Sequence, residues 1–208
     1  MSSTEDRHAH WQDVWSTKDH DKVSWFQDDP ALSLHLIHQT GLRRDAAIVD
    51  VGGGRSPLAG LLVEQGFSNV AVVDIAEAAL ARAHQDLGTL GDDVTWIAAD
   101  VLRWRPAPGL FDLWHDRAVC HFFTTPEDQA AYAETLRHAL APGGIAIIAT
   151  FAPDGPERCS GLTVARHDGA SLSALLGGDF ILEQERADTH VTPGGSAQRF
   201  CWCVFRRL

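Results

Sequence analysis

A glycine-rich turn directly after a short apolar run is the stretch of this chain best suited to bind a ligand. Residues 48–51 form a β-branched run, and Ser56 and Pro57 open a helical pattern a few residues later. Between them the turn contains Gly52, Gly53 and Gly54. Glycine lets the backbone turn sharply and approach a ligand, and the N-terminus of the following helix favours polar or anionic groups. The sequence therefore predicts a binding site for a nucleotide-like ligand.

The acid before this turn, Asp50, separates two classes of ligand. A dinucleotide fingerprint has a third glycine at the position occupied here by Pro57. The Asp50 carboxylate would also repel a pyrophosphate, but it would attract the amino group of an amino-acid-like ligand. A nicotinamide-dependent reductase is therefore the weaker interpretation, and a turn that binds no ligand is a further alternative.

Two more acids end predicted strands. Asp74 closes the apolar run 70–74, twenty residues beyond Gly54, where a carboxylate can accept hydrogen bonds from both ribose hydroxyls. Asp100 closes the run 94–100 in the same way. An N-cap of a short turn is the alternative role for Asp100.

The pattern Asp50-x-Gly52-x-Gly54 resembles motif I of the class I S-adenosylmethionine (SAM)-dependent methyltransferases. A third acid such as Asp100 is expected in SAM sites and not in dinucleotide sites. The resemblance implies SAM as cofactor and S-adenosylhomocysteine as product. It also implies that Ile75 lies against the adenine and that Val101 supplies a backbone contact. The cofactor residues expected from it are Asp50, Gly52, Gly53, Gly54, Asp74, Ile75, Asp100 and Val101. Residues 140–144, Leu-Ala-Pro-Gly-Gly, match the turn that in this family ends a helix and starts the fifth strand, with Gly143 as a left-handed helix cap.

A charged cluster lies at the end of the fourth predicted strand and in the loop after it. It contains His115, Asp116, Arg117 and His121. Ligands of open α/β sheets bind beyond the carboxyl ends of the strands, so these side chains are expected at the methyl-transfer site. His115, His121 or Asp116 would act as a base or orient the acceptor, and Arg117 would bind an anionic group. An Asp116–Arg117 ion pair that only shapes the loop is the alternative.

Residues 1–41 are predicted to form an N-terminal helical arm or lid over a methyltransferase domain at 42–208. Trp11 and Trp15 are four residues apart and share one face of a helix. Since an aromatic face attracts a sulfonium, Trp15 is expected over the cofactor; simple anchoring of the arm is the other interpretation. The Trp11-x-x-x-Trp15 arm and the Asp116-Arg117-Ala118 step resemble the thiopurine and thiol S-methyltransferases.

Apolar runs and helical patterns alternate along the chain. Strands are expected near 47–51, 69–74, 93–98, 110–115, 144–150, 179–189 and 198–206. Helices are expected near 31–41, 56–66, 76–88, 126–140 and 168–177. This order predicts an α/β, Rossmann-like methyltransferase fold: a seven-stranded, mostly parallel sheet with an antiparallel terminal hairpin and helices on both faces.

Composition limits the class of protein. A chain of 208 residues with 45% apolar residues suits one folded unit. A net charge of −11 argues against nucleic acid as a partner, and no run resembles a membrane span. The polar N-terminus differs from a signal peptide, so a cytoplasmic location is expected. The four cysteines lack the spacing of a metal site, so no metal is expected; Cys201 and Cys203 are interpreted as core residues on one face of a strand.

The sequence thus predicts a SAM-dependent methyltransferase that modifies a nucleophilic heteroatom of a small molecule, with a thiol or another soft atom favoured. A protein-lysine N-methyltransferase is the alternative, in which the acidic surface recruits a basic partner. The Asp-Lys-Gly-Thr loop typical of one such group is absent. A non-catalytic SAM-binding module is a lesser alternative, and the chain is expected to be a monomer or a homodimer.

Overall fold

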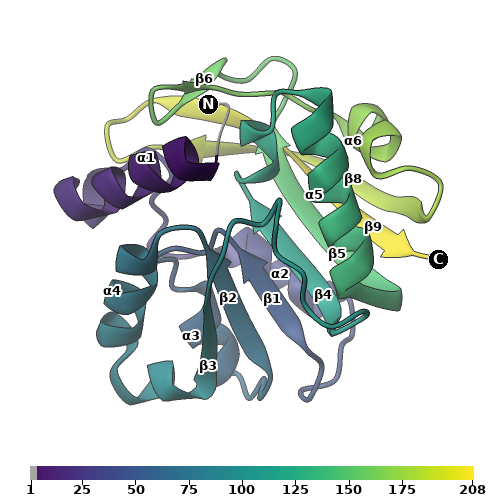
Figure 1. Cartoon of the computed structure of the whole chain (residues 1–208), viewed down its shortest axis with the longest axis horizontal. Helices are drawn as coiled ribbons and strands as arrows, with labels where there is room; N and C mark the ends of the chain where they lie inside the picture. Colours follow the sequence, from purple (N-terminus) through teal and green to yellow (C-terminus); the bar gives the residue numbers. More distant parts are fainter. Residues whose placement is uncertain (1–3) are drawn as a thin grey trace.

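A seven-stranded sheet organises the chain (Figure 1). The computed structural model describes residues 4–208, so the first three residues of the predicted arm lie outside the described part. The strands are β1 (Ile48–Val51), β2 (Val70–Asp74), β3 (Val94–Ala98), β4 (Phe111–Arg117), β5 (Leu140–Phe151), β8 (Phe180–Val191) and β9 (Ala197–Arg207). They lie in the order β3-β2-β1-β4-β5-β9-β8. The first five are parallel, and β9 is antiparallel to both β5 and β8, which confirms the predicted fold.

Helices cover both faces of this sheet, and Figure 1 shows α5 in front of it and α2 behind it. One apolar core packs α2 (Ala31–Gln39), α3 (Leu58–Glu64) and α4 (Glu77–Leu87) against the sheet. The other core packs α5 (Pro126–Ala139) and α6 (Gly169–Leu176) against the opposite face. Neighbouring strand residues alternate between the two cores, as Ile48 and Val49 do in β1, because side chains of a strand point alternately to its two faces.

The shorter elements lie in the connections. They are the 3₁₀ helices η1 (His20–Lys22), η2 (Gly88–Asp93) and η3 (Cys120–Phe122) and the small hairpin of β6 (Arg158–Cys159) with β7 (Leu162–Thr163). The N-terminal helix α1 (Thr4–Thr17) lies across the ends of the central strands (Figure 1). Its Arg7 reaches Asp100 beyond β3, and its Trp15 packs on Gly54 beyond β1. Both contacts place α1 at the carboxyl edge of the sheet. No helix within residues 4–208 combines the length and the apolar character needed to cross a bilayer.

Two details differ from the sequence-based expectation. Strand β4 continues to Arg117, two residues past the expected end, so Asp116 and Arg117 lie within the strand rather than beyond it. The prediction of Gly143 as a helix cap is wrong, because α5 ends at Ala139 and Leu140 is already extended and paired with Phe111. Gly143, at φ +78°, instead lies in a bulge of β5: the next pair in the ladder joins Leu113 to Ile145, which leaves three extra residues on β5.

Candidate functional site

The glycine turn after β1 is required by both backbone conformation and space. Gly52 and Gly54 have φ values of +63° and +51°, in the left-handed region that favours glycine. A Cβ atom on Gly53 would lie 2.5 Å from Oδ2 of Asp50, and one on Gly54 would lie 2.6 Å from Cζ2 of Trp15. The turn is therefore packed tightly between the strand below and the indole of α1.

Asp74 stands at the end of β2, buried in the wall of a cavity. Its Oδ1 accepts a hydrogen bond of 2.8 Å from the backbone N–H of Ala76. Burial raises the pKa of Asp74 to about 6, although hydrogen bonds from the backbone of Ala76, Gly54 and Ile75 oppose the shift. Hydroxyl groups of a ligand could donate to this carboxylate in place of the water that burial removes, and so stabilise its ionised form.

Asp100, beyond β3, ties the N-terminal helix to the sheet. Its Oδ2 accepts a hydrogen bond of 2.9 Å from Nη2 of Arg7, and its Oδ1 accepts one of 3.1 Å from the backbone N–H of Leu102. The second contact supports the alternative view of Asp100 as the cap of a short turn. The ion pair with Arg7 also fixes α1 over the end of β3.

A cavity of about 790 Å³, part of it open to solvent, lies between α1 and the ends of β1, β2 and β3. The sheet side is lined by Val51, Gly52, Asp74, Ile75, Asp100 and Val101, and the opposite side by Arg7, Trp11, Trp15, Trp25 and Phe122. The aromatic rings meet edge to face, with Trp11 centred 5.8 Å from Trp25 and 5.0 Å from Phe122. The cavity thus brings five of the predicted cofactor residues together on one side, with Trp15 on the opposite side.

A second cavity of about 540 Å³ lies on the other side of the glycine turn. Asp50, Gly53, Arg55, Ser56 and His115 line it, and it shares Trp15, Trp25, Val51, Gly52 and Arg117 with the first cavity. The two cavities therefore flank one turn and have a common border at Arg117. An elongated ligand with a polar end would fit along this line.

Asp50 and His115 form a buried pair on the α2 face of the sheet. His115 Nδ1 and Asp50 Oδ1 are 2.7 Å apart, and His115 Nε2 is 3.0 Å from Oγ of Ser33. A carboxylate only accepts, so Nδ1 donates to Asp50 and Nε2 accepts the Ser33 hydroxyl proton in the neutral imidazole. Both ring nitrogens are thus engaged, and the histidine holds Asp50 in place beside the second cavity.

Asp116 faces the opposite side of the sheet, under α5, and has no exposed surface. Tyr132 donates a hydrogen bond of 2.6 Å to its Oδ2, and the backbone N–H groups of Val119 and Cys120 donate to the same carboxylate. Burial raises the pKa of Asp116 to about 6 against these stabilising donors. The contacts hold the turn after β4, in which Ala118 has a φ of +69°.

Arg117 and His121 end in different surroundings. Arg117 Nη1 donates to the carbonyl of Trp25 at 3.0 Å, while its buried Nη2 has no hydrogen-bond partner within residues 4–208. Burial lowers the pKa of Arg117 to about 10, so it remains charged near neutral pH. His121 lies between Phe122 and Phe151, and burial together with the charge of Arg117 lowers its pKa to about 3. Of the predicted acceptor-site cluster, Arg117 reaches both cavities and His115 one, whereas Asp116 and His121 line neither.

The sequence and the fold were compared with those of known proteins. Residues 48–144, from β1 into the bulge of β5, match a family described as a methyltransferase domain. Residues 48–144 thus form a methyltransferase domain, and the chain has the Rossmann-like fold of the class I SAM-dependent methyltransferases. No curated protein sequence matches it.

Solved structures resemble this methyltransferase over nearly its whole length. One comes from work on the conversion of a disulfide bond into a thioacetal group during echinomycin biosynthesis: TM-score 0.80, 18% identity, 97% of this chain and 92% of that chain covered. A second is the Burkholderia thailandensis 1,6-didemethyltoxoflavin-N1-methyltransferase: TM-score 0.74, 22% identity, coverage 100% and 91%. A third is the N-methyltransferase NodS from Bradyrhizobium japonicum: TM-score 0.69, 16% identity, coverage 96% and 98%. At these identities the similarity establishes the shared fold.

Several residues of the methyltransferase site were missed by reasoning from the sequence. Arg7 pairs with Asp100, Ser33 holds His115, and Val119 packs against Gly52. Arg7 is four residues before Trp11, so helical spacing could have indicated that it shares the cavity-facing side of α1. Ser33 and Val119 carried no such signal, because their contacts are to residues distant in the sequence.

Proposed function

We propose that this methyltransferase transfers the methyl group of SAM to a nucleophilic heteroatom of a small molecule enclosed between the glycine turn and the tryptophans of α1. The observation that carries this proposal is the cavity itself, which joins two acid-bearing strand ends to an aromatic roof. SAM supplies an electrophilic methyl group on a sulfonium. The remaining steps, which are binding, orientation and exclusion of water, belong to the residues of this chain.

The cavity walls suit each part of the cofactor. Asp74 would accept hydrogen bonds from the ribose hydroxyls, and Ile75 and Val101 would contact the adenine beside Asp100. Asp50, held by His115, would bind the ammonium group from the second cavity. Trp15, on the opposite wall, offers an aromatic face to a sulfonium.

A soft acceptor atom is favoured by the side chains that line the larger cavity. Within residues 4–208 this lining includes no histidine, and its two acids, Asp74 and Asp100, are those assigned to the cofactor. A thiol needs little help from a base, because a thiolate forms readily near neutral pH and is a strong nucleophile. Cys159 also lines the cavity, but burial raises its pKa to about 11, so it stays a neutral thiol that does not compete with the substrate.

Arg117 would select an acceptor that carries an anionic group. Its Nη2 atom is buried without a partner in the described structure, and its side chain borders both cavities. A carboxylate or similar group on the acceptor would pair with this guanidinium and orient the nucleophile toward the methyl group. Such positioning lowers the activation free energy by several kcal/mol, and by about 7 kcal/mol or more when the geometry is ideal.

A protein acceptor is the second candidate, because the net charge of −11 would attract a basic partner. The small-molecule proposal is supported by the enclosing position of α1 and by the B. thailandensis relative, whose structure holds 1,6-didemethyltoxoflavin. Both candidates share the cofactor residues, so the acceptor alone distinguishes them.

The test combines cofactor binding with an acceptor screen. Calorimetry should show heat with SAM and S-adenosylhomocysteine and none with NAD, and Asp74→Asn should weaken the SAM signal. Thiols, amines and acids are then screened for release of S-adenosylhomocysteine, with Glu183→Gln as a surface control. Turnover only with a purified protein acceptor would reject the small-molecule proposal. Tight SAM binding without turnover on any acceptor would favour a non-catalytic binding module.

A further inference from the structure

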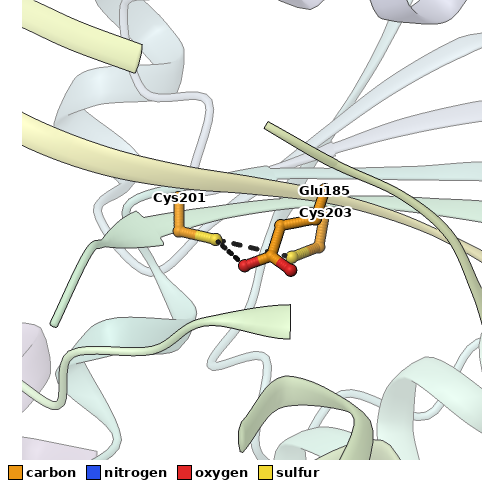
Figure 2. Close-up of side chains that lie close together, drawn as sticks. All are labelled: Glu185, Cys201 and Cys203. Carbon is orange, nitrogen blue, oxygen red and sulfur yellow. Dashed lines mark hydrogen bonds between the residues drawn. The ribbon is translucent and has the colours of Figure 1, made fainter. Parts of the chain in front are cut away.

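Two thiols and a carboxylate converge on the α6 face of the sheet, separate from both cavities. Cys201 and Cys203 are two residues apart on β9, so both side chains point to the same face of the sheet. Glu185 of β8 pairs directly with Cys203 across the two strands. Figure 2 shows the three side chains pointing toward one another. All four cysteines of the chain are free thiols.

The distances in this cluster fit a tetrahedral metal ion. The two Sγ atoms are 3.7 Å apart, and Sγ of Cys201 is 3.4 Å from Oε1 of Glu185. Around a tetrahedral Zn²⁺ with bonds of about 2.3 Å to sulfur and 2.0 Å to oxygen, the S···S edge is about 3.8 Å and the S···O edge about 3.5 Å. One ligand atom from each residue lies within 4.8 Å of the other two. Two of the three ligand–ligand distances therefore already match those around a shared ion, and the third is within 4.8 Å.

The surroundings hold the ligands in this arrangement. The backbone N–H of Gly169, at the start of α6, donates a hydrogen bond of 3.0 Å to Oε1 of Glu185. A Cβ on Gly169 would lie 2.6 Å from Oε2, so the glycine allows this close approach. Such an outer hydrogen bond orients a ligating carboxylate. Thr150, paired with Cys201 across β5 and β9, has a buried Oγ1 without a partner in residues 4–208, which suits a water in the fourth position.

We propose that Cys201, Cys203 and Glu185 bind a thiophilic divalent cation, with Zn²⁺ as the expected ion. Binding forms two metal–thiolate bonds and one metal–carboxylate bond, and the two thiol protons are released to solvent. The ion would fasten β8 and β9 to the N-terminus of α6. This departs from the expectation of no metal, because the third ligand is on another strand and the Cys-x-Cys spacing alone carries no metal signature.

The competing state is a metal-free hydrogen-bonded cluster, since the same distances also suit thiol donors. A disulfide is the other competitor, but residues two apart on an extended strand have Cα atoms about 6.6 Å apart, at the upper end of the range for a disulfide. The metal-free cluster predicts that the reduced protein does not bind added metal.

The experiment titrates the reduced full-length protein with Co²⁺ as an optical probe for Zn²⁺. We expect a thiolate-to-cobalt charge-transfer band that saturates at one equivalent and is lost on addition of Zn²⁺. The Cys201→Ser/Cys203→Ser variant should lose the band. Glu185→Gln should weaken binding by about 10-fold or more. Cys159→Ser serves as the thiol control and Glu183→Gln as the carboxylate control, and both should keep wild-type affinity.

A second readout keeps the test decisive if the double variant folds poorly. Zn²⁺ should raise the melting temperature of wild-type protein and of Glu183→Gln, with a smaller rise for Glu185→Gln, because a ligand that binds only the folded state stabilises it. The proposal is overturned if the reduced wild type shows no charge-transfer band. It is equally overturned if Glu185→Gln and wild type bind Co²⁺ with the same affinity, or if the band survives in the double cysteine variant.

Discussion

Two buried carboxylates on the neighbouring strands β1 and β4 have opposite surroundings. Asp50 faces α2, is held by His115, and lines a cavity. Asp116 pairs with Val51, one position further along the same strands, but its side chain faces α5. There its carboxylate accepts hydrogen bonds from Tyr132 and from two backbone N–H groups. The strand alternation that separates the two acids therefore separates ligand binding from support of the turn. A carboxylate near an active site is available for chemistry only if its face of the sheet leads to the cavity.

The largest effect is expected from Asp116→Ala. It leaves the buried Tyr132 hydroxyl and the N–H groups of Val119 and Cys120 without an acceptor, so the free energy of unfolding should fall by about 3 kcal/mol or more. Urea unfolding followed by circular dichroism measures it. Asp112→Ala, which removes the acceptor of one hydrogen bond from the backbone N–H of Ala47, is the control and should lower the free energy of unfolding less. A stable Asp116→Ala protein without turnover would instead give Asp116 a catalytic role.

Asp50→Ala should act on binding more than on folding. Loss of the carboxylate removes the acceptor that the cofactor ammonium would use, so the Kd for S-adenosylhomocysteine should rise by about 10-fold to 100-fold. Calorimetry measures this change. Ser33→Ala, which removes only the support of His115, should raise the Kd less. Equal Kd values for Asp50→Ala and wild type would remove Asp50 from the cofactor site.

Arg117→Gln tests the border between the two cavities. Without the charge of the guanidinium, kcat/KM for an acceptor with an anionic group should fall by about 10-fold or more, since a hydrogen bond to a charged group is worth about 1.5–3 kcal/mol. An uncharged analogue of the same acceptor should be affected less, which makes it the matched control. A parallel rise in the Kd for SAM would show that Arg117 binds the cofactor carboxylate instead.

The gathering of glycines and acids at the strand ends was predictable because its signals are local. Gly52 and Gly54 are demanded by backbone conformation, and Asp74 follows from its place at the end of an apolar run. The acceptor half depends on which face of β4 each residue occupies and on what covers it. His115 and Asp116 are adjacent in the sequence, yet only His115 faces a cavity, because β4 includes both residues and neighbouring side chains of a strand point to opposite faces. The partners that decide their roles, Ser33 and Tyr132, come from distant helices.

The smallest effect is a pH dependence that separates Asp74 from Asp116. Burial raises the pKa of both from 3.8 to about 6, so each favours its protonated form in the folded protein. Their contribution to stability is present below pH 3.8 and is lost as the pH rises through about 6. Cofactor binding should follow the opposite trend, because the ribose hydroxyls need the ionised form of Asp74.

Between pH 7.5 and 5.5 the Kd for S-adenosylhomocysteine should therefore rise about fourfold for a single group with a pKa of about 6. Calorimetry at several pH values gives this profile, and Asp74→Asn should weaken binding and flatten it. Asp116→Asn should leave the profile in place while it flattens part of the pH dependence of unfolding, since Asp116 lines neither cavity. A binding profile that persists in Asp74→Asn but disappears in Asp116→Asn would reverse the roles assigned to the two faces of the sheet.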